Sequence, residues 1–360
     1  MFLLPSVHRA AVAGALLLGL YALPSRAATF TVSNLNDNGA GSLRQAITDA
    51  NSASGSDVVT FAPNLAGTIP LALVLGISDS VRIEGPGADK LILKGNSQYQ
   101  SLSFSSGTSF LSGVTVADAS PYAYSSGAGI SNAAGSDLTL SNCQFRNNTS
   151  RNGRYGIAGV GGAVSNNGTM TIDGCTFENN TASSGRGGAV NNIGTLSVSN
   201  SAFDANSACR GGAIYNSAIL SVSNSTFNAN TVSPLITGSD PLSFPQYTSV
   251  NHGLGSVLYN EAETKSVALT NCTLSGNTVM GTQWDYNIDA GEKRTGAIHN
   301  ASGALSLINC TLSGNIDART RIEEEDRIGT LVNKGTLSCL NTVFVDSGAT
   351  PVFGLTVPLV

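Results

Sequence analysis

The chain has 360 residues, of which only 11% are charged, and its formal net charge is −5 at pH 7. So few lysines and arginines argue against binding to nucleic acid, which needs a basic surface for the phosphate backbone. Hydrophobic residues make up 41% of the chain. Together with a strict sequence period, this favours one folded, elongated domain over a disordered chain.

Residues 1–27 are expected to form a signal peptide. His8 and Arg9 precede an apolar run that extends to Leu23, and Ser25-Arg26-Ala27 has the small-residue pattern of a cleavage site. The run is too short to span a bilayer, and an N-terminal membrane anchor is the alternative. We therefore expect a mature chain that begins at Ala28. We expect it to be exported to the periplasm, the cell surface or the extracellular space.

Residues 28–57 are expected to form an N-terminal cap. Thr29–Val32 is typical of a strand, and Ser42 and Gln45 have the spacing of a helix capping box. Apolar residues then recur at helical spacing as far as Asn51, namely Leu43, Ala46, Ile47 and Ala50. A solenoid needs such a cap because its first turn otherwise exposes core and unpaired strand edges.

Residues 58–360 are expected to form a stacked array of short strands. The first strands are irregular and are predicted at Val58–Ala62, Leu73–Leu75, Val81–Ile83, Leu91–Leu93, Leu102–Phe104 and Val114–Val116. A repeat follows, in which Gly187–Asn206 and Gly211–Asn230 are nearly identical. One asparagine of each repeat, which we call the ruler asparagine, recurs at Asn132, Asn166, Asn192, Asn216, Asn260, Asn300 and Asn333. The unit is about 24 residues, lengthened by insertions.

Aligned repeats give columns of identical side chains. An inward column holds Phe145, Phe177, Phe203, Phe227, Leu274, Leu312 and Phe344. One corner column holds Asn142, Gly174, Asn200, Asn224, Asn271, Asn309 and Asn341, and a second holds Asn148, Asn180, Asn206, Asn230, Asn277 and Asn315. Asparagine suits corners because it tolerates left-handed backbone angles. The columns predict an all-β fold: a right-handed, single-stranded, pectate-lyase-like parallel β-helix with an N-terminal capping helix.

The N-terminal segment Gly41-Ser-Leu-Arg-Gln-Ala-Ile47 resembles the Cys-Ser-Leu-Arg-Glu-Ala-Ile signature of secreted bacterial β-helix proteins, from which it departs at Gly41 and Gln45. The paired Gly-Gly-Ala-Ile and Phe-x-x-Asn motifs, as in Gly211–Ile214 and Phe227–Asn230, resemble those of polymorphic outer membrane proteins. The resemblance covers nearly the whole mature chain. It implies a secreted or surface-exposed protein of the adhesin type.

Four of the six cysteines share one inward column. Cys143 lies one repeat from Cys175, and Cys272 lies one repeat from Cys310, so each pair is within the reach of a disulfide. The same column also holds Ser201, Ser225 and Thr342, which favours a simple packing column of small residues. Both interpretations stay open. Neither Cys209 nor Cys339 adds to a zinc-type spacing.

The insertions all fall at one point of the repeat, at about 149–160, 181–186, 207–210, 231–254, 278–294 and 316–328, so they are expected to stack along one face. Next to them, Tyr215, Tyr259 and His299 occupy one outward column, and the insertion 278–294 contains Trp284 and Tyr286. Aromatic faces suit sugar rings. We therefore predict a carbohydrate site at these five residues, although stacking that only stabilises the sheet is an equal alternative.

A second candidate site consists of two carboxylates, Glu178 and Asp204, and two arginines, Arg186 and Arg210. These residue types would suit a polysaccharide lyase, which uses carboxylates to hold Ca²⁺ and a basic residue to abstract a proton. Surface ion pairing is the simpler alternative. The acidic run 323–326 is a solvated loop or, less simply, a Ca²⁺ ligand set.

These features predict a secreted or surface-associated binding protein of the adhesin type, whose ligand is a carbohydrate or another cell-surface component. No cofactor or resident metal is expected, apart from the possible Ca²⁺, and the protein is expected to be a monomer. One alternative is a lyase or glycoside hydrolase that acts on an acidic polysaccharide. Another is a structural envelope protein without a small ligand.

Overall fold

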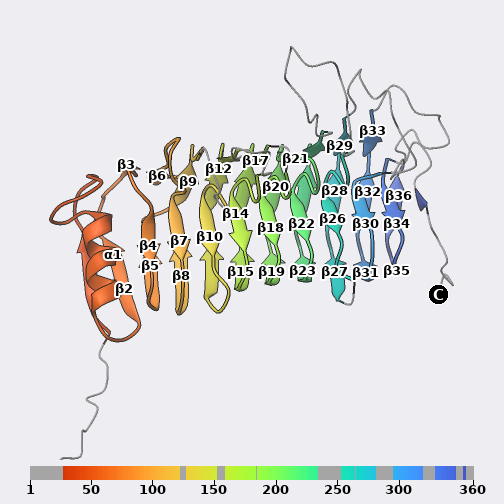
Figure 1. Ribbon diagram of the computed structural model, residues 1–360. Helices are drawn as coiled ribbons and strands as arrows, with labels where there is room; N and C mark the ends of the chain where they lie inside the picture. The colour runs from red at the N-terminus through yellow and green to blue at the C-terminus, as the bar shows by residue number, and fades with distance from the viewer. Residues whose placement is uncertain are drawn as a thin grey trace, which may run out of the picture.

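The computed structural model describes residues 27–121, 127–151, 159–183, 185–233, 253–263, 265–280, 295–318, 329–345 and 352–353. They form a long parallel β-helix, closed at its N-terminal end by one α-helix (Figure 1). This confirms the predicted fold, whose right-handed sense is that of parallel crossovers in general. The signal peptide and the centres of the long insertions lie outside the described residues.

Four parallel sheets run along the axis. Sheet A consists of β1 (Thr29–Val32), β2 (Asp57–Phe61), β5 (Val81–Glu84), β8 (Thr108–Ser112), β11 (Asp137–Ser141), β15 (Thr169–Asp173), β19 (Thr195–Ser199), β23 (Ile219–Ser223), β27 (Ser266–Thr270), β31 (Ala304–Ile308) and β35 (Thr336–Leu340). Sheet B consists of β3 (Gly67–Pro70), β6 (Leu91–Lys94), β9 (Thr115–Ala117), β12 (Gln144–Arg146), β16 (Thr176–Glu178), β20 (Ala202–Asp204), β24 (Thr226–Asn228), β28 (Thr273–Ser275), β32 (Thr311–Ser313) and β36 (Val343–Val345).

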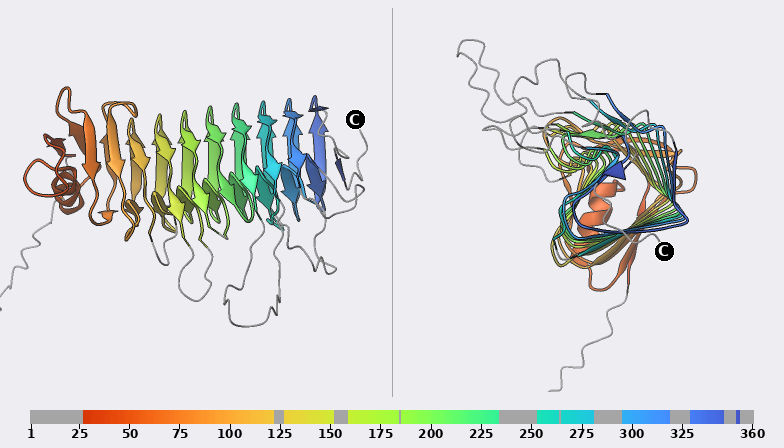
Figure 2. Two further views of the ribbon diagram at one scale, coloured as in Figure 1. Left: turned by 90° about the horizontal axis from the view of Figure 1, so that it is seen from above. Right: turned by 90° about the vertical axis from the view of Figure 1, so that its right-hand side faces the viewer.

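Sheet C consists of β4 (Leu75–Ile77), β7 (Leu102–Phe104), β10 (Ile130–Asn132), β14 (Val164–Asn166), β18 (Val190–Asn192), β22 (Ile214–Asn216), β26 (Leu258–Asn260), β30 (Ile298–Asn300), β34 (Leu331–Asn333) and β37 (Val352–Phe353). The short sheet consists of β13 (Thr149–Ser150), β17 (Thr181–Ala182), β21 (Ser207–Ala208), β25 (Thr231–Val232), β29 (Thr278–Val279) and β33 (Ile316–Asp317). From β11 to β34 each rung passes from sheet A through sheet B and the short sheet to sheet C, and successive rungs superpose along the axis (Figure 2). The earlier rungs, from β2 to β10, have no described strand in the short sheet.

The strand register follows the sequence repeat. Asn192 lies beside Asn216 and Asn216 beside Asn260, as the ruler asparagine predicts. The early rungs were harder to predict from sequence. The strands β3 and β8 have no counterpart among the predicted ones, and β4 begins at Leu75, where the predicted strand ends. These rungs lack the asparagine columns, so the sequence offers no register there.

The two corners of the rung use different residues for the sharp bend. At the first corner, asparagines such as Asn200 and Asn224 have φ of 50° and 48°, and Gly174 has 62°. This confirms the left-handed angles predicted for that column. At the second corner the left-handed residue is one position earlier than predicted, for example Ala205 and Ala229 at 52° each. The buried asparagine that follows has a different role.

These buried asparagines form hydrogen-bond ladders along the axis. Asn180 Nδ2 donates to Asn206 Oδ1 at 3.0 Å and to the Phe145 carbonyl at 2.9 Å, while its backbone N–H donates to the same Oδ1 at 3.0 Å. The ruler asparagines form a second ladder, in which Nδ2 of Asn192 donates to Oδ1 of Asn216 at 2.7 Å. Each amide thereby satisfies backbone groups that a corner would leave buried and unpaired.

A stack of rings fills the core. Phe145, Phe177, Phe203 and Phe227 are all within 1% of full burial, and their centroids follow one another at 4.8, 4.7 and 4.8 Å. The predicted inward column therefore exists. Its rings are nearly parallel because each is carried by the same strand position in successive rungs.

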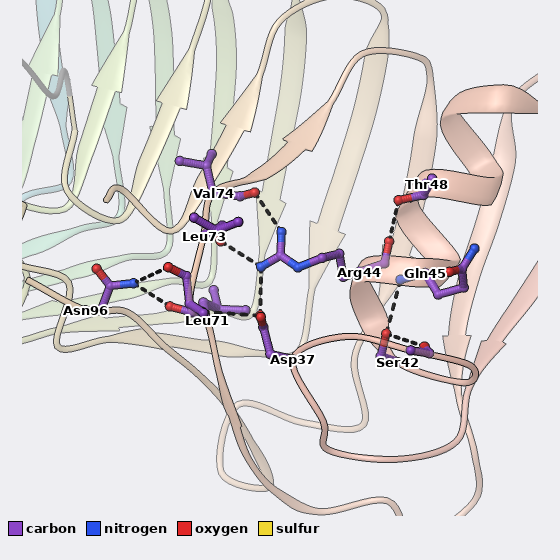
Figure 3. A network of polar contacts seen from close by, with 11 residues as sticks. Asp37, Ser42, Arg44, Gln45, Thr48, Leu71, Leu73, Val74 and Asn96 are labelled. Carbon is purple, nitrogen blue, oxygen red and sulfur yellow. Dashed lines mark hydrogen bonds and ion pairs between the residues drawn. The ribbon is translucent and has the colours of Figure 1, made fainter. Parts of the chain in front are cut away.

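Helix α1 (Leu43–Ser52) covers the first rung with Leu43, Ala46, Ile47 and Ala50, all buried. Ser42 is its N-cap, and its Oγ accepts the Gln45 N–H at 3.2 Å. The capping box is incomplete, because the Gln45 side chain donates to Asp49 instead. Arg44 fastens the helix to the next turn. Its guanidinium contacts Asp37 and the carbonyls of Leu73 and Val74 at 2.7–2.8 Å (Figure 3).

Candidate functional site

The predicted aromatic column exists, but it is not exposed. Tyr215 and Tyr259 stack with centroids 5.7 Å apart, and Tyr259 and His299 stack at 5.3 Å. Their strands are in register in sheet C. Tyr215 and His299 are fully buried and Tyr259 is 6% exposed. The prediction of an open aromatic surface for a sugar ring at these three residues is therefore wrong.

The cover over the rings comes from the segment just before each Gly-Gly pair. There Val160, Arg186, Arg210 and Leu254 form a row of single parallel bridges. The Arg186 guanidinium lies 4.8 Å from the centre of the Tyr215 ring and donates to its hydroxyl at 2.9 Å. Arg210 lies 5.4 Å from the centre of the Tyr259 ring. Cation–π stacking and burial thus make the column a structural element. Trp284 and Tyr286 lie outside the described residues.

The carboxylate–arginine site is only half assembled. Glu178 and Asp204 lie side by side on sheet B, as predicted. However, they contact amides of their own face: Gln144 Nε2 donates to Glu178 at 3.5 Å, and Asn228 Nδ2 donates to Asp204 at 2.9 Å. Arg186 instead approaches Glu261 at 3.8 Å, over sheet C. The structure therefore places the arginines in the cover of the aromatic column, apart from the two carboxylates.

The cysteine column is also where the sequence placed it, and Cys143, Cys175, Cys272 and Cys310 are all buried in it. The Cys143 N–H donates to Cys175 Sγ at 3.5 Å, and the Cys175 N–H donates to Ser201 Oγ at 3.1 Å. Interaction with the Cys272 thiol lowers the pKa of Cys310 to about 7. Thiol and hydroxyl thus occupy the column interchangeably, as a packing column of small residues predicts.

A surface that the sequence reasoning did not single out lies on the outer side of sheet A. Strands β15 to β35 alternate between a buried apolar residue and an outward residue that is mostly serine or threonine. We call these outward residues the hydroxyl face; they are Thr169, Thr171, Thr195, Ser197, Ser199, Ser221, Ser223, Ser266, Thr270, Ser306, Thr336 and Ser338. The Leu-Ser-Val-Ser alternation already contained this signal. Its apolar residues predicted the core, but its serines, which point outward, were not interpreted.

The hydroxyl face is flat, repetitive and nearly free of charge. Its strands pair residue for residue, for example Ser197 with Ser221 and Ser306 with Ser338, so the hydroxyls lie in rows one strand spacing apart. Asp173 is the charged residue at its N-terminal part. Hydrogen bonds from Ser199 Oγ at 2.6 Å and Asn200 Nδ2 at 2.7 Å hold the pKa of Asp173 below its ordinary value.

At the edge of the hydroxyl face, where the chain turns from sheet C into sheet A, lies an open cavity of about 680 Å³. We call it the corner cavity. Its lining combines the charged residues Glu263, Lys265 and Lys334 with Ser266 and Thr336 of the face. The volume is in the range of small-molecule sites. Two ammonium groups and one carboxylate give it a net positive charge, suited to an anionic group bearing hydroxyls.

Metal and membrane features are lacking in the part of the chain that the structure describes. No group of three or more His, Cys, Asp or Glu side chains there could hold a metal ion. The one helix of that part is also too short to cross a bilayer. The acidic run 323–326, the weaker Ca²⁺ candidate, lies outside it.

Comparisons with known proteins add a structural similarity. No family model matches the chain, and no curated protein matches it. Among solved structures, the chain is similar to the A-module of the mannuronan C-5 epimerase AlgE6 of Azotobacter vinelandii. The two share 14% identity over 84% of this chain and 94% of that one, with a TM-score of 0.27. The site described above therefore rests on the residues of this chain alone.

Proposed function

We propose that the protein is an exported β-helix binding module whose ligand is a glycan with acidic units. The observation that supports this most directly is the corner cavity, in which Lys265 and Lys334 adjoin the rows of hydroxyls on sheet A. Serine and threonine hydroxyls both donate and accept hydrogen bonds, as do the hydroxyls of a sugar. A glycan chain lying along the face would meet at least one serine or threonine hydroxyl on each rung from β15 to β35.

The charges of the cavity indicate the acidic component. A sugar carboxylate in the cavity would gain charge-assisted hydrogen bonds from the two lysines, which are stronger than neutral ones. The nearly uncharged hydroxyl face alone would favour neutral sugars as much as acidic ones. The affinity for acidic ligands is therefore expected to depend on the corner cavity. It is also expected to fall as the salt concentration rises, because both lysines are exposed.

The test is calorimetric titration of the protein with matched neutral and uronic-acid oligosaccharides at low and high salt. We expect binding of the acidic series, and about a tenfold or greater loss when Lys265 and Lys334 are both replaced by glutamine, given about 1.5–3 kcal/mol for hydrogen bonds to charged groups. Lys90→Gln is the matched control, since Lys90 is also exposed and lies on an N-terminal rung away from the cavity. Binding to no member of either series would refute the glycan proposal.

Trp284 gives a second test of the same proposal. It is the single tryptophan and belongs to the insertion 278–294, which the sequence places on one face with the other insertions. If that insertion contacts the glycan, Trp284→Ala weakens binding and the tryptophan fluorescence changes on titration. Unchanged affinity and fluorescence would confine the site to the cavity and the hydroxyl face, and would remove Trp284 and Tyr286 from it.

A further inference from the structure

One buried carboxylate of the described residues is only half satisfied, namely the side chain of Asp57. It begins β2 and is fully buried at the N-terminal end of sheet A. One oxygen, Oδ1, accepts the backbone N–H of Ala28 at 2.7 Å. The other, Oδ2, is buried without a hydrogen-bond partner among the residues that the structure describes. A buried carboxylate with one neutral donor is costly, because it loses its hydration without equivalent compensation.

No described basic side chain compensates for this charge. The arginine of the cap, Arg44, is already held by Asp37 and by the carbonyls of Leu73 and Val74. The backbone around Asp57 is occupied as well, since its own N–H donates to Ser80 and the Val58 N–H donates to Ala28. The Ala28 nitrogen, which already donates to Oδ1, is therefore the described atom that could compensate for the charge of Asp57 if it became positively charged.

Ala28 is also the first residue of the predicted mature chain. Ser25-Arg26-Ala27 predicts hydrolysis of the Ala27–Ala28 peptide bond. In that step water adds across the C–N bond, so that Ala27 leaves with the new carboxylate and Ala28 retains the nitrogen as an amine. The amine takes up a proton from solvent at neutral pH. The resulting ammonium carries more donors than the former amide and a full positive charge.

We infer that cleavage after Ala27 completes a partly buried ion pair between the new α-ammonium of Ala28 and the carboxylate of Asp57. The nitrogen already lies at hydrogen-bond distance from Oδ1, and a second N–H can reach the unpartnered Oδ2. The pair ties β1 to β2 at the open end of sheet A. Asp57 thus distinguishes the correctly processed N-terminus from any other, and the inference is independent of the proposed ligand.

The test uses the full chain, exported and processed, and first determines the mature N-terminus by mass spectrometry; we expect Ala28. A variant with one glycine inserted between Ala27 and Ala28 then moves the ammonium about 3.3–3.6 Å away from Asp57 while leaving the cleavage pattern intact. Both forms are prepared with Asp57 and with Asp57→Asn. Thermal unfolding is measured for all four proteins, and Asp89→Asn, at an exposed carboxylate, is the control for charge loss.

The expected result is non-additive. The glycine insertion lowers the midpoint of unfolding by several degrees when Asp57 is present, and by much less in the Asp57→Asn background. Equal shifts in the two backgrounds, or a mature N-terminus elsewhere than Ala28, would overturn the inference. If Asp57→Asn does not fold, acetylation of the processed α-amino group in the wild-type protein replaces it. A midpoint unaffected by that acetylation would contradict the ion pair.

Discussion

At the residue scale, asparagine has a different function at each of the two corners of a rung. Asparagine at the first corner supplies a left-handed backbone angle, as at Asn224, whereas asparagine after the second corner supplies an amide to a buried ladder, as at Asn206. The sequence shows both columns equally well, so their existence was predictable. Their difference was not, because a left-handed angle at Ala205 has no signature in a single side chain.

This difference predicts opposite sensitivities to mutation. Asn206→Leu removes the acceptor of two hydrogen bonds from Asn180 and leaves buried groups unpaired, at about 1–3 kcal/mol for each. We expect a loss of at least about 3 kcal/mol in the free energy of unfolding, measured with urea. Asn224→Gly, which keeps the corner angle at an exposed position, should change it by less than about 1 kcal/mol. Equal losses would show that the ladder has no special role.

The cysteine column makes a milder prediction. Since Ser201 and Ser225 occupy the same buried column, Cys175→Ser should cost less than about 1.5 kcal/mol in unfolding free energy. Cys175→Leu should cost more, about 1–3 kcal/mol or above, because the column has no space for a larger side chain. The comparison is made by urea unfolding under reducing conditions. If serine is the more damaging of the two, the packing interpretation of the column is wrong.

The hydrogen bonds to Asp173 predict a pH dependence. These hydrogen bonds lower the pKa of Asp173 in the folded protein. They therefore stabilise the folded protein fully at pH values above the pKa of an unfolded aspartate, which is about 3.9. That contribution is lost as the pH falls through the folded pKa. Wild type and Asp173→Asn, compared by urea unfolding at pH 6 and near pH 2, should therefore differ more at pH 6. A difference that is independent of pH would assign it to something other than the charge.

At the element scale, the outcome of prediction depended on whether an element repeats. The strands of the regular rungs and the helix α1 were predictable because their apolar residues recur at a fixed spacing in the sequence. The aromatic column shows where this fails. Tyr215 points outward from its own strand, but a neighbouring segment with Arg186 covers it, and periodicity along one strand contains no information on such a cover.

The contacts of Arg44 predict how strongly the helix α1 depends on one side chain. Arg44 joins α1 to the turn at Leu73 and Val74 through charge-assisted hydrogen bonds, so Arg44→Ala should cost about 1.5–3 kcal/mol. The loss should be concentrated at the N-terminal end, where hydrogen exchange of α1 amides should accelerate most. Arg82→Ala, at an exposed arginine that pairs with Glu84, is the control and should have little effect. Faster exchange spread evenly over all rungs would contradict a local role for Arg44.

At the scale of the whole molecule, the chain is a one-dimensional stack in which each rung contacts only its neighbours (Figure 1). Stability is then approximately a sum of rung and interface terms, without one central core. Of the early rungs, which lack the asparagine ladders, only the first, with β2 and β4, packs against the helix α1 in the described part of the chain. The hydroxyl face also belongs to this scale, because no single strand forms it. It becomes visible only when the outward residues of sheet A are stacked.

The last prediction follows from this architecture. Phe203 lies in the middle of the ring stack and is 1% exposed, whereas Phe344 occupies the same column near the end of the described rungs and is only partly buried. Phe203→Ala should cost about 3–5 kcal/mol and interrupt the stack, so that rungs on either side exchange amide hydrogens at different rates. Phe344→Ala should cost clearly less and affect only the adjacent rungs. Hydrogen exchange followed by mass spectrometry measures both, and acceleration of all rungs alike in the Phe203 variant would mean that the β-helix unfolds as a single cooperative unit.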